Sequence, residues 1–132
     1  MSFHAVPPGV TMPKGVRAPG ALVIGRSATI HGGIDARGPV HVAPGAHVDG
    51  EIRAVGDVII GARAFVGGGI RAEGRVVLQE GCRVAGEVDA ADDCVARPGA
   101  RAWKLRVGGD LHLHGVAAPT QDAQVKGRTL NQ

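Results

Sequence analysis

The sequence predicts an all-β protein: a single-stranded, three-sided parallel β-helix, or solenoid, in which one chain coils through short strands. Three observations predict it: a gapless repeat, an alternation of apolar residues inside each repeat, and a near absence of rings. The chain has 132 residues, of which 44% are hydrophobic, only 2% are aromatic and 22 are Gly. That length fits one domain, and a core of small aliphatic side chains must be thin and regular.

The repeat begins at Leu22 and decides the architecture. Four blocks of 18 residues align without gaps, and they read LVIGRSATIHGGIDARGP (22–39), VHVAPGAHVDGEIRAVGD (40–57), VIIGARAFVGGGIRAEGR (58–75) and VVLQEGCRVAGEVDAADD (76–93). A fifth block, CVARPGARAWKLRVGGD, is one residue shorter, and a sixth begins with LHLHG at Leu111. The repeat therefore predicts about five to six turns of 18 residues.

Each block contains three pairs of apolar positions, which predict three short strands per turn. In the second block these strands cover 40–42, 46–48 and 52–54. Within each pair an outward residue, polar in most of the strands, separates two inward apolar ones, which is the alternation of a half-buried strand. The first and last residue of each strand should therefore point into the core.

Glycine marks two of the three corners of each turn. One corner has Gly32, Gly50, Gly68 and Gly86, and another has Gly38, Gly56 and Gly74. Glycine tolerates a positive φ, so we expect the same bend at these corners on every turn. The third corner varies, from Ala-Pro-Gly at 43–45 to Gly-Ala-Arg at 61–63.

The segments outside the blocks lack the pattern of a capping helix. We expect residues 1–21, with four prolines, to be a flexible Pro-rich arm, 22–115 to be the β-helix domain, and 116–132 to be a flexible polar tail. Without caps, both end turns expose apolar side chains and unpaired backbone groups. The predicted polymerisation surfaces are Leu22, Val23 and Ile24 at the N-terminal end and Trp103, Leu105, Val107, Leu111 and Leu113 at the C-terminal end.

The register I-x-A-x-G-x-V-x-I-G-x-G-A-x-V-x-G-x, with short tails and no caps, resembles the bactofilin family of polymer-forming cytoskeletal proteins over roughly residues 20–115. The resemblance implies a right-handed coil, although the repeat alone fits either hand. It also implies end-to-end assembly without nucleotide into non-polar filaments, through contacts between like ends. The implied role is a non-enzymatic scaffold in the cytoplasm or at the inner face of the membrane. Its tails would recruit cell-wall, polarity or chromosome-segregation proteins.

Two further surfaces are candidates for contact with other molecules. The second position of each block points outward and is mostly apolar, which gives a lateral or partner face of Val23, His41, Ile59, Val77 and Val95, with Phe65 also outward. In the arm, Phe3, Lys14 and Arg17 are the candidates for membrane or partner contact. One ring and two charges are less than stable anchoring requires, so we expect weak or no direct membrane binding.

Two alternatives remain open, and one of them is an enzyme. A left-handed hexapeptide-repeat trimer of the acyltransferase or carbonic-anhydrase-like type needs a pocket, yet the blocks have no insertions to build one. It also needs converging imidazoles, whereas the histidines at 31, 41, 47, 112 and 114 show no such spacing. We expect no catalytic residue, no cofactor and no metal. The other alternative is a monomeric adaptor whose tails cover its ends.

Charge and cysteine content restrict the remaining classes. The sequence pI is near 9.4, but segment 22–115 carries 11 basic and 11 acidic residues, and the excess is in the tails. Without a basic stripe we expect no direct nucleic-acid binding, and a neutral body opposes stacking only weakly. Cys82 and Cys94 fit buried thiols of a reducing compartment.

Overall fold

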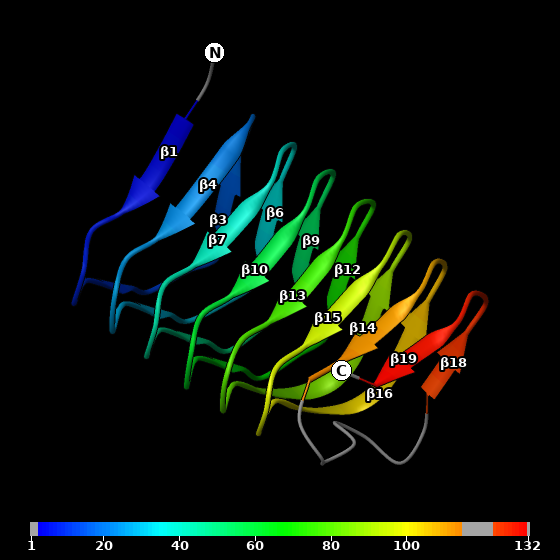
Figure 1. Cartoon of the computed structure of the whole chain (residues 1–132). Helices are drawn as coiled ribbons and strands as arrows, with labels where there is room; N and C mark the ends of the chain where they lie inside the picture. The colour runs from blue at the N-terminus through cyan, green and yellow to red at the C-terminus, as the bar shows by residue number, and fades with distance from the viewer. Residues whose placement is uncertain (1–2, 115–122, 132) are drawn as a thin grey trace.

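The computed structural model describes residues 3–114 and 123–131, and in these ranges every regular element is a β-strand. Figure 1 shows one chain coiling through about seven turns. Strands of successive turns pair in parallel, as β10 (Val58–Ile60) does with the strands before and after it. The predicted β-solenoid is confirmed, and it has more turns than the repeat predicted.

The strands form three faces, numbered in the order in which a turn crosses them. Face one is an eight-stranded sheet of β1 (Phe3–Val6), β4 (Ala21–Ile24), β7 (Val40–Val42), β10, β13 (Val76–Leu78), β15 (Cys94–Ala96), β17 (Leu111–Leu113) and β19 (Thr129–Asn131). Face two has β2 (Thr11–Met12), β5 (Thr29–Ile30), β8 (His47–Val48), β11 (Phe65–Val66) and the first parts of β14 (Arg83–Ala90) and β16 (Arg101–Val107). Face three has β3 (Val16–Ala18), β6 (Ile34–Ala36), β9 (Ile52–Ala54), β12 (Ile70–Ala72), the second parts of β14 and β16, and β18 (Ala123–Val125).

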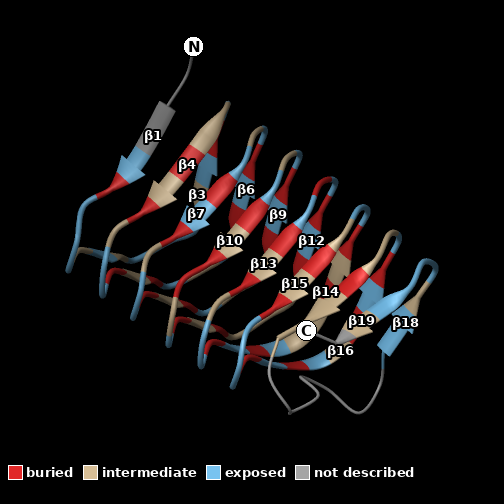
Figure 2. Cartoon of the chain, in the orientation of Figure 1, coloured by how far each residue is buried: buried red, intermediate tan, exposed pale blue. Residues whose placement is uncertain are grey.

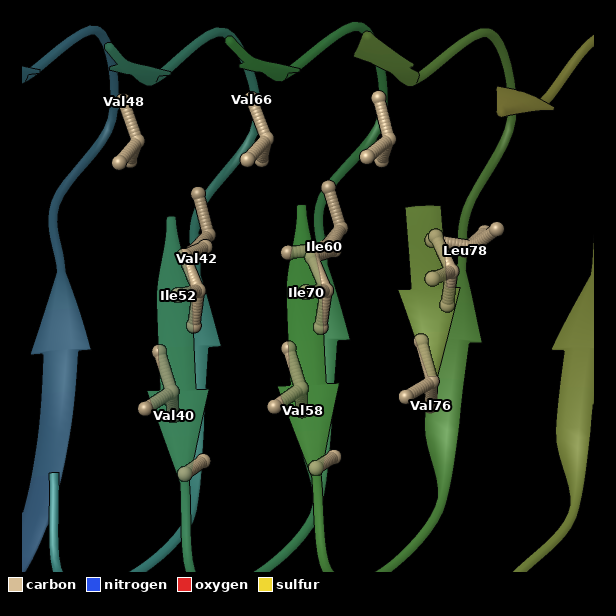
Figure 3. Packing of buried hydrophobic residues seen from close by; sticks show 14 of the residues in the cluster. Val40, Val42, Val48, Ile52, Val58, Ile60, Val66, Ile70, Val76 and Leu78 are labelled. Atoms are coloured by element: carbon tan, nitrogen blue, oxygen red, sulfur yellow. The ribbon is translucent and has the colours of Figure 1, made fainter. Parts of the chain in front are cut away.

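Inward side chains at equivalent positions stack into ladders along the axis. Val40, Val58 and Val76 form one such ladder, and Ile52 and Ile70 belong to another (Figure 3). Figure 2 shows buried and more exposed residues alternating along the strands, as the sequence predicted. No polar side chain of the described part of the chain is buried. Each fully buried Val or Ile contributes roughly 1.5–3 kcal/mol, and the repeat copies this contribution on every turn.

The glycine columns, the glycines that recur at two corners of each turn, were expected to allow a positive φ. Their φ angles are not in the left-handed region, so they are needed for another reason. A Cβ on Gly68 would lie 2.8 Å from the backbone nitrogen of Glu51 in the preceding turn. Glycine there allows successive turns to approach each other closely. The left-handed conformation occurs instead at the corner that varies in sequence, at Gly9, Ser27, Gly45, Arg63, Gly81 and Gly99.

The short fifth block lacks one corner residue. In the pairing of β14 with β16, Val84 faces Ala102 and Glu87 faces Lys104, so Trp103 lies opposite two residues. The extra residue of β14 forms a bulge. β14 and β16 each run around the corner between faces two and three as one strand, and β14 joins the two faces into a single 11-stranded sheet to which β16 also belongs.

Both tails differ from the expectation. Residues 3–18 form β1, β2 and β3, which pair with β4, β5 and β6. At the other end β18 and β19 pair with β16 and β17. The prolines of the N-terminal segment stand between its strands, where a missing N–H costs no ladder hydrogen bond. The division at residues 21 and 115 is therefore corrected; residues 1–2, 115–122 and 132 lie outside the described part of the chain.

Candidate functional site

The N-terminal end of the solenoid consists of β1, β2 and β3. Each of these strands pairs on one side only within the described residues, so its other edge presents unpaired N–H and C=O groups. Val10, Met12 and Val16 are only partly buried where they pack against the core. This end is an apolar cross-section bordered by three open strand edges.

The C-terminal end consists of β18 and β19, and Leu113 of β17, next to β19, is only partly buried. Among the described strands, β19 pairs only with β17 and β18 pairs only with β16. Ala123 and Thr129 are in register with buried residues of the preceding turn, yet both are exposed. A hollow of about 560 Å³ lies beside β18 and includes Val125 in its lining. This end is therefore also uncovered by any described residue.

The residues predicted for the ends are mostly one turn further in. β1 covers Leu22 and Ile24, which are buried, while Val23 points outward on face one. At the other end Leu105, Val107 and Leu111 are buried because β18 and β19 pair over them. Leu113 also lies in β17, with Asn131 of β19 as its Cα partner, but it is only partly buried, whereas Trp103 points outward from β16 and is 68% exposed.

The sequence contained a signal for the additional turn. Five of the six residues that lie 18 positions before the inward residues of the first block are apolar, namely Val6, Val10, Met12, Val16 and Ala18. Ala123 and Val125 continue the same register at the other end. The four prolines of residues 3–21 made this segment resemble a flexible arm. The segment is instead part of the solenoid: Phe3 begins β1, Lys14 follows β2, and Arg17 lies in β3 beside Asp35.

The predicted lateral face forms a continuous line on face one. Val23, His41, Ile59, Val77 and Val95 are Cα partners in neighbouring strands. No outward residue of β4, β7, β10, β13 or β15 carries an acidic or basic side chain other than histidine. Phe65 does not belong to this line, because it lies in β11 on face two.

A hydrogen-bonded cluster on face two was missed in the sequence. His31 Nδ1 lies 2.8 Å from one carboxylate oxygen of Asp49, and His47 Nε2 lies 2.7 Å from the other. The hydrogen bond with His31, supported by that with His47, lowers the pKa of Asp49 below its ordinary value. The His47 ring also stacks on Phe65, with 4.7 Å between ring centroids. Asp49 thus orients the rings of His31 and His47 on this side of the solenoid.

The remaining reactive groups are inert or dispersed. Burial raises the pKa of the free thiols Cys82 and Cys94 to about 12 each, so neither is a nucleophile at neutral pH. Within residues 3–114 and 123–131, no three His, Cys, Asp or Glu side chains are placed to hold a metal ion. No helix in the same ranges has the length and apolar character to cross a membrane.

Comparison with known proteins identifies a family. No curated protein and no solved structure matches the chain. The bactofilin family model, described as polymer-forming cytoskeletal, matches residues 10–103. The match begins inside the N-terminal turn, in agreement with the pairing of β2 and β3. Because it covers more than half of the 132 residues, the chain belongs to the bactofilin family of polymer-forming cytoskeletal proteins.

Proposed function

We propose that this bactofilin assembles end to end, without nucleotide, into non-polar filaments that act as a non-enzymatic scaffold in the cytoplasm. The observation that carries the proposal is that no described residue covers either end of the solenoid. Each end presents open strand edges and partly buried apolar side chains such as Met12 and Val125. Strand addition would supply several backbone hydrogen bonds at once and remove this apolar surface from water.

Contacts between like ends would make the filament non-polar. A two-fold contact uses the same surface on both subunits and closes on itself. If a two-fold contact between N-terminal ends alternates with a two-fold contact between C-terminal ends, subunits can be added without limit and a filament grows. Blocking one end should then leave dimers joined by the other end, whereas blocking one end of a head-to-tail filament should leave monomers.

Negative-stain electron microscopy and light scattering after size-exclusion chromatography test this. We expect filaments from the unmodified chain, dimers from Met12→Arg and from Val125→Arg, and monomers from the double variant. Val55→Arg is the matched control, because Val55 is 48% exposed on the side of the solenoid and its variant should keep the filaments. Leu105→Arg is unsuitable, because Leu105 is fully buried and its replacement would unfold the protein.

Each alternative has its own outcome in the same experiment. Filaments from the double variant would contradict assembly through the ends. Monomers from both single variants would show head-to-tail, polar filaments. A trimer of fixed mass from the unmodified chain would favour the hexapeptide-repeat alternative, and assays of acyl transfer and zinc content would follow. Circular dichroism of every variant separates a loss of assembly from a loss of fold.

We propose that face one serves lateral contacts between filaments. Its central outward side chains, Ile59, Val77 and Val95, are adjacent, apolar and partly exposed. Interfaces are depleted of charged residues at their cores, and in a filament this uncharged line would recur in every subunit. Ile59→Lys with Val77→Lys should give single filaments where the unmodified chain forms bundles. Unchanged bundles would assign lateral contacts to another face.

Recruitment of cell-wall, polarity or chromosome-segregation proteins is also part of the proposal, with one change from the expectation. Since residues 3–18 and 123–131 form strands, we place the binding of such partners on the side faces. Direct binding of membrane or nucleic acid is not proposed.

A further inference from the structure

Face two carries an arginine–aromatic patch, which we define as Phe65, Arg83, Arg101 and Trp103. Phe65, Arg83 and Arg101 are Cα partners on β11, β14 and β16, and Trp103 follows two residues later on β16. Both arginines are exposed, as is Trp103 at 68%. The chain has two Phe, one Trp and no Tyr, so most of its aromatic side chains stand on this face.

The two arginines lie beside each other, and no acidic side chain of the described residues pairs with either. Neighbouring strands are about 4.8 Å apart, so their guanidinium groups extend from adjacent positions. No ion pair or side-chain hydrogen bond connects either of them to a described residue. Like charges at adjacent positions repel. An anion that binds between them would therefore relieve an unfavourable interaction already present in the protein.

Carboxylates near the patch are already in use. Asp49 accepts hydrogen bonds from His31 and His47 through its two oxygens. Glu87 Oε1 lies 3.5 Å from Nε of Arg106, which is on face three. The stacking of His47 on Phe65 holds the aromatic border of the patch in place. The described part of the chain thus supplies no group that neutralises Arg83 and Arg101.

We propose that the arginine–aromatic patch binds an extended acidic segment of a partner protein. Two adjacent guanidinium forks suit carboxylates, which they bind through paired hydrogen bonds. Phe65 and Trp103, on either side, suit apolar residues that flank the acidic ones in such a segment. Membrane surfaces and nucleic acids are generally held by larger clusters of basic residues, so two arginines favour a peptide. This inference goes beyond filament formation and does not depend on it.

Trp103 provides the measurement, because it is the chain's single tryptophan and belongs to the patch. The full chain is titrated with a short peptide of glutamates around one leucine, and with the matching serine peptide. We expect a saturable change in Trp103 emission with the acidic peptide only. Arg83→Gln with Arg101→Gln should weaken binding by about tenfold or more, since charge-assisted hydrogen bonds are lost. Arg37→Gln with Arg71→Gln, the same charge change at exposed residues beside β6 and on β12, should leave binding unchanged.

Several results would overturn the proposal. The first is no saturable change with the acidic peptide. The second is an equal loss of binding in the two double variants, which would show attraction by net charge alone. Tighter, patch-dependent binding of phosphatidylglycerol vesicles or of an oligothymidine strand would assign the patch to lipid or to nucleic acid instead. Exposed arginines contribute nothing to the buried core, so both double variants should fold, and circular dichroism checks this.

Discussion

Of the residues that the structure describes, two other than glycine adopt the left-handed conformation. Ser27 has a φ of 55° and Arg63 a φ of 58°, at the corner where four other turns have glycine. The left-handed region costs an L-residue roughly 1–2 kcal/mol. The solenoid tolerates this cost because the neighbouring turns impose the same bend. At Arg63 the side chain is exposed, so few contacts compensate for the strain.

Arg63→Gly should therefore stabilise the fold. Relief of the strain exceeds the extra entropy that glycine gives to the unfolded chain, so we expect a gain of about 0.5–1 kcal/mol. Urea denaturation followed by circular dichroism measures it. Arg71→Gly is the matched control: Arg71 is exposed in the extended strand β12, so its replacement should destabilise. Equal effects of both substitutions would show that the left-handed bend stores no strain.

The two buried thiols make stability depend on pH in alkaline solution. Burial raises the pKa of Cys82 and of Cys94 from 9.0 to about 12. Above pH 9 the unfolded chain loses these protons while the folded chain keeps them, so the free energy of unfolding falls as pH rises towards 12. The fall is up to about 1.4 kcal/mol per pH unit for each thiol.

Replacing both thiols should reduce this dependence. Cys82→Ala matches its ladder neighbours Ala64 and Ala100, and Cys94→Val matches Val76, so the core volume changes little. Urea denaturation between about pH 8 and about pH 11 compares the two proteins. Parallel curves for the unmodified and the replaced chain would mean that the thiols do not resist ionisation.

At the scale of elements, the N-terminal strands cover the core of the next turn. Deleting residues 1–18 would expose Leu22, Ile24 and Ile30, which are now buried. Full burial of such a side chain contributes roughly 1.5–3 kcal/mol, and each of the three would lose part of this contribution. We therefore expect the free energy of unfolding to fall by several kcal/mol. Its slope against urea concentration should also decrease, because less surface is buried. Deletion of residues 1–2 is the control. An unchanged urea midpoint after the longer deletion would mean that residues 1–18 do not stabilise the solenoid, as expected of a flexible arm.

The sequence predicts the features that depend on residues close together in the chain, and it misses those that depend on contacts between turns. The alternation that buries Val40 and Val42 is local and recurs every 18 residues, so core and strands were predictable. The Asp49–His31 contact joins neighbouring turns, and it becomes visible only once their register is known. The glycine columns were found, but their purpose is the close approach of a neighbouring turn, which no local rule for φ contains. The end strands were missed because prolines masked a register that Met12 and Val16 maintain.

For the whole molecule, the charges at the ends matter more than the net charge of +3. The N-terminal turn contains Lys14 and Arg17 and no acidic residue up to position 20. The C-terminal strands and the turn between them, 123–131, contain Lys126 and Arg128 and no acidic residue. Contacts between two N-terminal ends therefore bring Lys14 and Arg17 of both subunits together, and Lys126 and Arg128 add positive charge at the C-terminal end, where Asp110 accepts a hydrogen bond from the backbone N–H of Arg128. Apolar contacts and strand pairing must overcome this repulsion.

Assembly should consequently increase with salt. Screening lengths fall from about 30 Å at 0.01 M to about 8 Å at 0.15 M, so the pelleted fraction of protein should rise between these concentrations and then level off. Lys14→Gln with Arg17→Gln should assemble more readily at low salt, whereas Arg37→Gln with Arg71→Gln, the same charge change away from the ends, should not. A pelleted fraction that falls with salt would mean that opposite charges hold the filament together. Binding of an acidic peptide to face two should weaken with salt, so the two properties of the molecule can be measured separately.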